Sequence, residues 1–154
     1  MSRILTRSQV IALLVLCAGS SLAGAWGPGS FDNDDALDWA QTFEAKPSMS
    51  ALISQLESVT RAGYIEAPEG SAAIAAAEVI AAIAGKAASN LPAELAAWAR
   101  QQPKADALQQ LSLARRAVER VARGDESELR ELWQESNDAS WQASIAGLER
   151  RLSP

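Results

Sequence analysis

The sequence predicts an all-α fold, a compact bundle of about six to seven short helices. Apolar residues recur at helical spacing along most of the chain, and prolines and glycines divide it into short segments. No segment alternates Val, Ile or Thr with polar residues, as a half-buried strand would. The 154 residues are 48% hydrophobic and 21% charged, which suits one globular domain, expected over residues 24–154.

Residues 1–23 have the pattern of a secretory signal peptide. Arg3 and Arg7 precede the apolar run 10–17, and small residues follow from 18 to 25. This order predicts cleavage after Ala23, with cleavage after Ala25 as the alternative. The protein is therefore expected to be exported, either to the periplasm or into the medium.

Two other interpretations of the N-terminus are less well supported. A lipoprotein would be acylated at Cys17, but the preceding residue, Leu16, is bulky where the acylation motif requires a small one. An uncleaved anchor would need ~20 apolar residues, and the apolar run 10–25 is shorter and contains Ser and Gly. No stable membrane span is expected after cleavage.

The first two helices are predicted from caps and breakers. One runs over residues 33–45, is capped by Asp32 or Asn33, and ends at Lys46-Pro47. The next covers residues 48–62, where apolar residues at i, i+3, i+4 and i+7 form one face. Gly63 is a plausible stop.

The middle of the chain predicts an alanine-rich helix and a short one. Residues 71–89 contain the run AAIAAAEVIAAIAGKAA. Alanine favours helix and takes little volume, so this helix is expected at the centre, where neighbouring helices approach closely. Pro92 in the first turn opens a helix over 93–101 that carries Trp98.

Three helices are predicted in the C-terminal third. Residues 104–123 have a regular apolar stripe that ends at Gly124. Asp125 and Glu128 have the spacing of a capping box, which would start a short helix. The last helix is expected over 137–152. The short connections favour antiparallel neighbours.

The residue inventory excludes several kinds of chemistry. The chain has no His and one Cys, which rules out His/Cys zinc sites, Ser-His-Asp triads and Cys-His pairs. Its net charge of −5 disfavours nucleic-acid binding, which requires a basic face. We expect neither a metal ion nor a cofactor.

The first candidate site is an acidic group near residue 35. Asp32, Asp34, Asp35 and Asp38 do not form an EF-hand, because position 6 of the loop would be Leu37 instead of Gly. Acids in a first turn offset the helix dipole, which explains part of the group. Asp34, Asp35 and Asp38 exceed this need and are candidates for binding a partner or a cation.

Aromatic residues accompany this acidic group. Trp26 and Phe31 are expected to fold back over Trp39 as a hydrophobic staple, and Trp26 and Trp39 join the candidate binding residues. The four tryptophans Trp39, Trp98, Trp133 and Trp141 are expected mainly to supply volume to an alanine-rich core, with stacking on a sugar as the alternative.

Glu78 is the second candidate, because it stands alone in the apolar run 72–84. The favoured interpretation is that it points to water. The alternative is burial against Arg115 or Arg116, since an unpaired buried charge is costly. If it faced Asp34 and Asp38, the carboxylates would resemble an acid/base pair.

A third group, of arginines, is expected to be a solvated helix face. Arg115, Arg116, Arg120 and Arg123 lie on one helix, and Glu119 has the spacing to pair with Arg115 and Arg123. An anion-binding or acidic-partner patch is the alternative.

Three motifs carry a resemblance to a known family. Residues 24–40 (GAWGPGSFDNDDALDWA), the alanine-rich run 72–85 and SELRELWQES at 127–136 resemble bacterial proteins grouped as domain of unknown function 4259. Members typically start at a Met directly before a Gly-x-Trp-Gly block, so a leader before this block is a departure. The resemblance implies an all-α domain with the N-terminal block as a fixed element, and it supplies no catalytic residues.

The function predicted from the sequence is non-enzymatic binding of another protein. An exported inhibitor or immunity-type module with a basic partner fits the acidic charge and the missing catalytic residue types. The alternative is a carboxylate-based hydrolase or a cell-wall glycan-binding protein that uses Asp34, Asp38 and Glu78 with Trp stacking on sugar.

Overall fold

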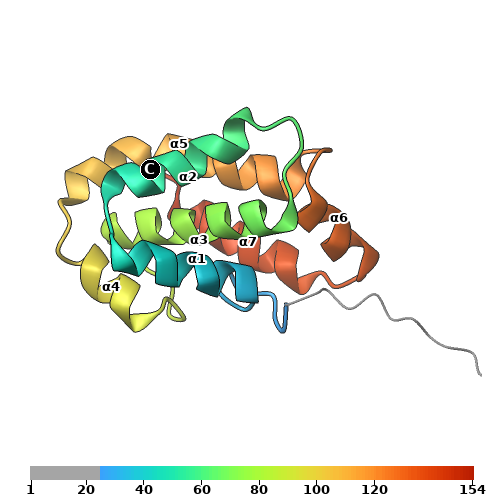
Figure 1. Ribbon diagram of the computed structural model, residues 1–154, viewed down its shortest axis with the longest axis horizontal. Coiled ribbons are helices and arrows are strands. Elements are labelled where there is room, and N and C mark those ends of the chain that lie inside the picture. The colour runs from blue at the N-terminus through green and yellow to red at the C-terminus, as the bar shows by residue number, and fades with distance from the viewer. Residues whose placement is uncertain (1–24) are drawn as a thin grey trace, which may run out of the picture.

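The computed structural model describes residues 25–154, and this part of the chain is built from helices without a β-sheet (Figure 1). The all-α prediction is confirmed. The predicted signal peptide, with Cys17, lies outside the described residues. The helices are α1 (Asp34–Ala45), α2 (Met49–Arg61), α3 (Ala67–Ile83), α4 (Ala93–Ala99), α5 (Lys104–Arg123), α6 (Glu128–Glu135) and α7 (Ser140–Arg151).

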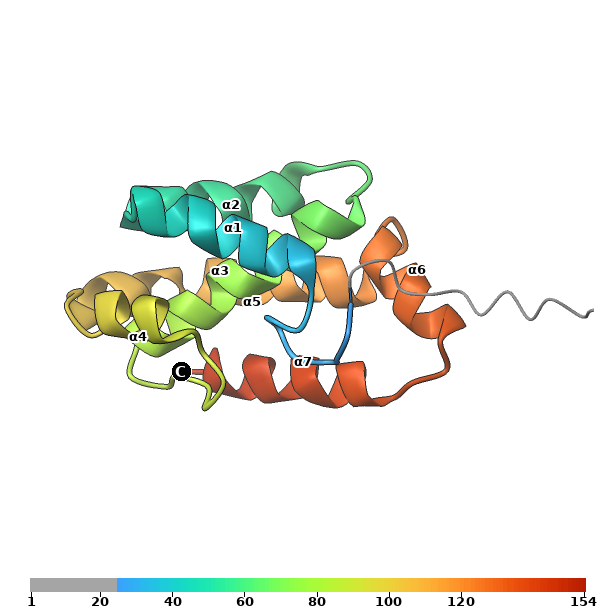
Figure 2. The ribbon, with the colours of Figure 1, turned by 60° about the horizontal axis from the view of Figure 1, so that its bottom comes forward.

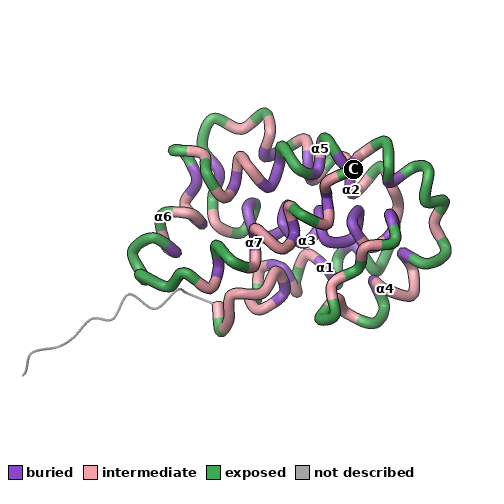
Figure 3. Tube along the Cα trace, turned by 180° about the vertical axis from the view of Figure 1, so that it is seen from behind, coloured by how far each residue is buried: buried purple, intermediate pink, exposed green. Residues whose placement is uncertain are grey.

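Helix α3 is the centre of the bundle. It contacts every other helix, and Figure 2 shows α1 and α2 on one side of it and α7 on the opposite side. Thirteen of its 17 residues are buried, and Figure 3 shows purple, buried segments in the middle of the bundle around α3. Burial on all sides requires small side chains, and the alanines provide them.

The first two helices begin where local signals place them. The side chain of Asn33 accepts a hydrogen bond from the backbone N–H of Ala36 at 2.8 Å, and Ser48 accepts one from Ala51 at 3.1 Å. These are N-cap bonds, which satisfy donors left free in the first turn.

Helix α3 differs from its prediction at both ends. It begins at Ala67 instead of residue 71, with Pro68 in its first turn, and it ends at Ile83 instead of residue 89. Pro is tolerated in a first turn because the N–H it lacks has no partner there. Beyond its end, Gly85 has a φ of 89°, a left-handed conformation that favours glycine.

The predicted capping box before α6 is wrong. The N-cap is Ser127 instead of Asp125, and no side chain caps the helix itself. The carboxylate of Glu128 turns to α3 instead, where it accepts a hydrogen bond from the N–H of Ala67 at 2.7 Å.

Helix α5 has its predicted bounds, whereas α4 and α7 are shorter than predicted. Helix α4 ends at Ala99, and α7 starts at Ser140 because Asn137 adopts a φ of 55°, which interrupts the helical backbone. Trp133 of α6 and Trp141 of α7 stack with ring centroids 5.8 Å apart and are both buried, as expected for core residues.

Among residues 25–154, no helix has the length and apolar character needed to cross a bilayer.

Candidate functional site

A groove of about 380 Å³ runs along α1 and collects three carboxylates around a tryptophan. We call it the acidic groove. Helix α1 supplies the first three of its lining residues, α2 the fourth, and α3 the others: Asp35, Asp38, Trp39, Gln55, Pro68, Glu69 and Ala72.

The spacing of α1 places its three groove residues together. Asp35, Asp38 and Trp39 are at i, i+3 and i+4, so they share one side of the helix, next to the side that packs into the core. Trp39 stacks on Phe43 of that core at 5.2 Å between ring centroids, and Phe43 meets the edge of Trp98 at 5.1 Å. The indole in the groove is therefore held in place by core aromatics.

The groove is electrostatically uncompensated. Within the described part of the chain, no salt bridge involves Asp35, Asp38 or Glu69. Burial, together with the charges of Asp34, Asp38 and Glu128, raises the pKa of Asp35 above its ordinary value of 3.8. A cation placed here would relieve the repulsion among these carboxylates.

Glu69 is a site residue that the sequence analysis missed. It lies in the first turn of α3, but the predicted helix begins at residue 71 and so leaves Glu69 outside. The available signal was Pro68-Glu69, the order expected of a first turn with an acidic residue near the positive end of the helix.

Two predicted site residues lie outside this groove. Asp34 is exposed and adds charge beside it. Trp26 is 60% exposed, so the predicted packing of this side chain over Trp39 is wrong, whereas Phe31 is buried in the core.

The N-terminal block that precedes α1 is fixed through Asp32. The N–H of Gly29 donates to the Asp32 carboxylate at 2.9 Å, and the N–H of Trp26 donates to its backbone carbonyl at 3.0 Å. A Cβ at Gly27 would lie 2.6 Å from the same carboxylate, so the close approach requires a residue without a side chain.

Glu78 is buried, and the prediction that it points to water is wrong. Its carboxylate accepts hydrogen bonds from Arg151 Nη2 at 2.5 and 2.6 Å and from Ser30 Oγ at 2.8 Å. Neither Arg115 nor Arg116 is its partner. The ion pair joins α3 to α7 and to the loop before α1, so Glu78 serves the fold.

Glu78 also points away from the acidic groove. Along α3 it is six residues from Ala72, which lines the groove. That separation corresponds to about 120° around the helix axis and ~9 Å along it. The structure thus brings Asp35 and Asp38 together with Trp39, and it places Glu78 elsewhere.

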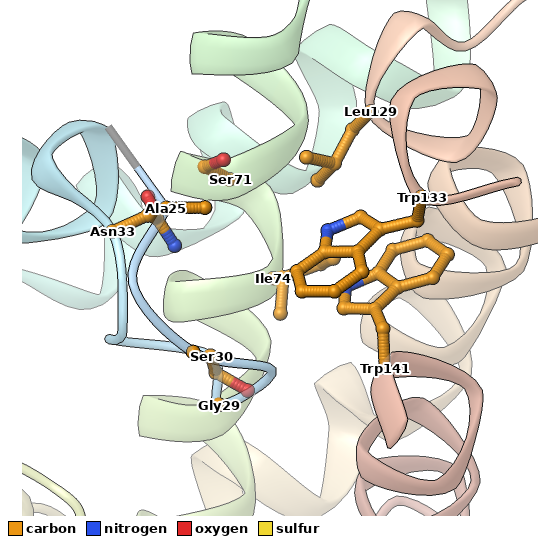
Figure 4. A pocket seen from close by; sticks show the side chains of 10 residues that line it. Ala25, Gly29, Ser30, Asn33, Ser71, Ile74, Leu129, Trp133 and Trp141 are labelled. Carbon is orange, nitrogen blue, oxygen red and sulfur yellow. The ribbon is translucent and has the colours of Figure 1, made fainter. Parts of the chain in front are cut away.

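A small cavity lies between the N-terminal loop and the stacked tryptophans (Figure 4). Its volume is about 20 Å³, with Ser71, Ile74 and Trp133 among its walls. Such a volume suits a single water molecule and excludes a substrate.

The arginines of α5 are largely engaged with neighbouring groups. Arg115 pairs with Glu119 at 3.3 Å as predicted, but Arg123 pairs with Glu149 instead, at 2.6 Å. Arg120 donates to the carbonyl of Ala62 at 3.0 Å and also binds Glu126. These contacts favour a structural role for this helix face.

Within residues 25–154, no three His, Cys, Asp or Glu side chains gather closely enough to hold a metal ion.

A model of the family described as "Domain of unknown function (DUF4259)" matches residues 24–144. No curated protein and no solved structure matches the chain.

Proposed function

The chain belongs to the DUF4259 family, and we propose that it is a non-enzymatic module that binds a basic segment of another protein through the acidic groove. The observation that carries the proposal is a set of three carboxylates that have no salt-bridge partner among residues 25–154 and that line one groove with the Trp39 indole, which stacks on Phe43.

A lysine or arginine side chain satisfies both features of the groove. Its charged end would lie among Asp35, Asp38 and Glu69, and its aliphatic stem or guanidinium plane would pack on Trp39. The net charge of −5 would steer a basic partner towards the protein before contact. An inhibitor or immunity-type role would follow if the bound partner were an enzyme or toxin.

The hydrolase alternative has less support. It requires Asp34, Asp38 and Glu78 to act on one substrate, and the Glu78 carboxylate is occupied by Arg151 and Ser30. Glycan binding retains one supporting feature, because Trp39 beside carboxylates also suits a sugar ring. We therefore treat soluble cell-wall fragments as competitors in the test.

The test is a pull-down from cells that make the protein, with three baits. We expect the wild-type protein and the exposed control Glu135→Gln to capture a basic partner. The triple variant Asp35→Asn, Asp38→Asn, Glu69→Gln should lose it. The captured protein, once purified, should bind more weakly as salt rises, because the contacts are between partly exposed charges.

Two results would reject this proposal. One is a partner that the triple variant retains with unchanged affinity. The other is a partner displaced by soluble cell-wall glycan, which would assign the groove to sugar.

We also propose that the protein acts outside the cytoplasm, in the periplasm or the medium. The order of positive, apolar and small residues over 1–23 supports this, and so does a family match that begins at residue 24. Mass spectrometry of the protein from its own cells should find Gly24 at the N-terminus. An intact Met1 would contradict export. An acylated Cys17 would contradict cleavage after Ala23 and would identify an exported lipoprotein instead.

A further inference from the structure

A second groove, of about 480 Å³, lies between the C-terminal end of α1 and helix α4. We call it the α1/α4 groove. Its walls are mainly apolar, with the Phe43 and Trp98 rings in edge contact at 5.1 Å and with Pro47, Leu95 and Ala97 around them. Aromatic side chains in such positions are typical of the centre of protein interfaces.

The charged residues of this groove are all acidic. Glu44 of α1 and Glu94 of α4 line it, and both are exposed. In the described part of the chain neither takes part in a salt bridge. Two helices thus each place one free carboxylate beside an apolar wall.

We infer that the α1/α4 groove is a second interaction surface, which receives an apolar side chain of a protein partner from a segment flanked by lysine or arginine. The apolar side chain packs against Trp98 and Phe43, and the flanking cations face Glu44 and Glu94. Charge complementarity selects this occupant, because an acidic or neutral apolar segment would leave both carboxylates without partners.

The α1/α4 groove stands apart from the acidic groove. Its lining includes none of the residues of the acidic groove, and Glu44 is about 180° around α1 from Asp35 by helical geometry. Each groove can therefore fail its test without the other.

Three six-residue peptides, all blocked at both ends, test the inference on the full chain. The first is Lys-Lys-Leu-Phe-Lys-Lys, the second replaces Leu-Phe by Gly-Gly, and the third replaces every Lys by Glu. The readout is the NMR signal of each tryptophan indole N–H, with Trp98 assigned from the Trp98→Phe spectrum. We expect only the first peptide to shift the Trp98 signal in a saturable way.

Two variants define the groove. Glu44→Gln with Glu94→Gln should weaken binding of the first peptide by about 2- to 25-fold, since exposed pairs each contribute about 1.4- to 5-fold. Ala97→Gln keeps helix propensity but fills the groove, and should abolish the Trp98 shift. Glu135→Gln is the matched control and should change nothing.

Other outcomes overturn the inference. If the glycine peptide bound as tightly as the first peptide, the groove would not recognise an apolar side chain. If the glutamate peptide bound as tightly, the groove would not select basic segments. A shift at Trp39 alone would assign the peptide to the acidic groove, which supports the proposed function and rejects this one. Concentration-dependent self-association that Ala97→Gln abolishes would assign the groove to a second copy of the chain.

Discussion

At the scale of single residues, the buried pair of Glu78 and Arg151 shows how a charge is accommodated in an alanine-rich core. The Glu78 side chain is 4% exposed and that of Arg151 is 27% exposed. Removing one member of a buried pair leaves the other uncompensated, which costs more than the pair itself contributes.

Arg151→Met should therefore destabilise the protein by about 3 kcal/mol, at the lower end for a broken buried pair because Arg151 is partly exposed. Urea unfolding at neutral pH would measure this change in the free energy of unfolding, with Arg150→Met as an exposed control. Adding Glu78→Gln to Arg151→Met should recover part of the loss, because the buried charge is gone. A double variant as unstable as the sum of the single ones would contradict this explanation.

The raised pKa of Asp35 predicts a pH effect. The folded state holds the Asp35 proton more tightly than the unfolded chain, so the contribution of Asp35 to stability falls as the pH rises from 3.8 through the folded pKa. Burial is the main cause and the charge of Asp34 the next.

Asp34→Asn should lower the pKa of Asp35 towards 3.8, because it removes a neighbouring negative charge. An NMR titration of the Asp35 carboxyl carbon would show the shift. Glu135→Gln, remote in sequence, should leave that titration unchanged. An unchanged Asp35 titration in the Asp34→Asn protein would mean that the charge of Asp34 does not contribute to this pKa.

At the scale of elements, the start of α3 depends on a residue that lies 61 positions away in the sequence, Glu128. Helix α3 has no side-chain cap of its own. Instead, the Glu128 carboxylate of α6 accepts a hydrogen bond from the Ala67 N–H, which joins α6 to the first turn of α3.

Glu128→Ala should cost about 1–2 kcal/mol of stability, the usual effect of a lost cap with a charged acceptor. It should also speed hydrogen exchange at the Ala67 amide more than at amides in the middle of α3. Glu135→Gln on the same helix serves as the control for unfolding. Unchanged exchange at Ala67 would show that this bond does not hold the turn.

The sequence predicts the start of a helix well where the cap is a neighbouring residue, and poorly where the cap comes from another helix. Helices α1 and α2 begin within about one residue of their predictions, because Asn33 and Ser48 cap them locally. The predicted N-cap of α6 is wrong because Glu128 has the spacing of a local capping box yet binds another helix, and the predicted start of α3 is wrong because no local side chain caps that helix. Sequence spacing cannot distinguish these two uses.

The packing of α3 gives a second prediction for an element. Ala76 is fully buried, and a larger residue there has no space to enter. Ala76→Leu should destabilise by about 1–3 kcal/mol through overpacking. The same change at exposed Ala105 of α5 should stay within about 0.5 kcal/mol. Urea unfolding of both variants would test the central position of α3.

At the scale of the whole molecule, the candidate site was only partly predictable. The spacing on α1 indicated Asp35, Asp38 and Trp39 as neighbours, because helical periodicity is a local property. Glu69 and the partner of Glu78 were missed, since both depend on how distant helices pack. Trp26 was misjudged because nothing in its spacing shows that the chain turns it outward.

The C-terminal end of the chain gives the last prediction, because the family match stops at residue 144 while the core continues. Ile145, Leu148 and Leu152 are buried, and Arg151 pairs with Glu78. Three buried aliphatic side chains contribute about 5–9 kcal/mol, close to the total stability of a small domain of about 5–15 kcal/mol.

A chain ending at Ser144 should therefore lose cooperative unfolding in urea, whereas a chain ending at Leu152 should keep it. Heat-induced unfolding followed by circular dichroism would provide a second readout. If the shorter chain unfolded cooperatively with nearly full stability, residues 24–144 would suffice for the fold. The ion pair of Glu78 would then be an addition to the bundle and not one of its supports.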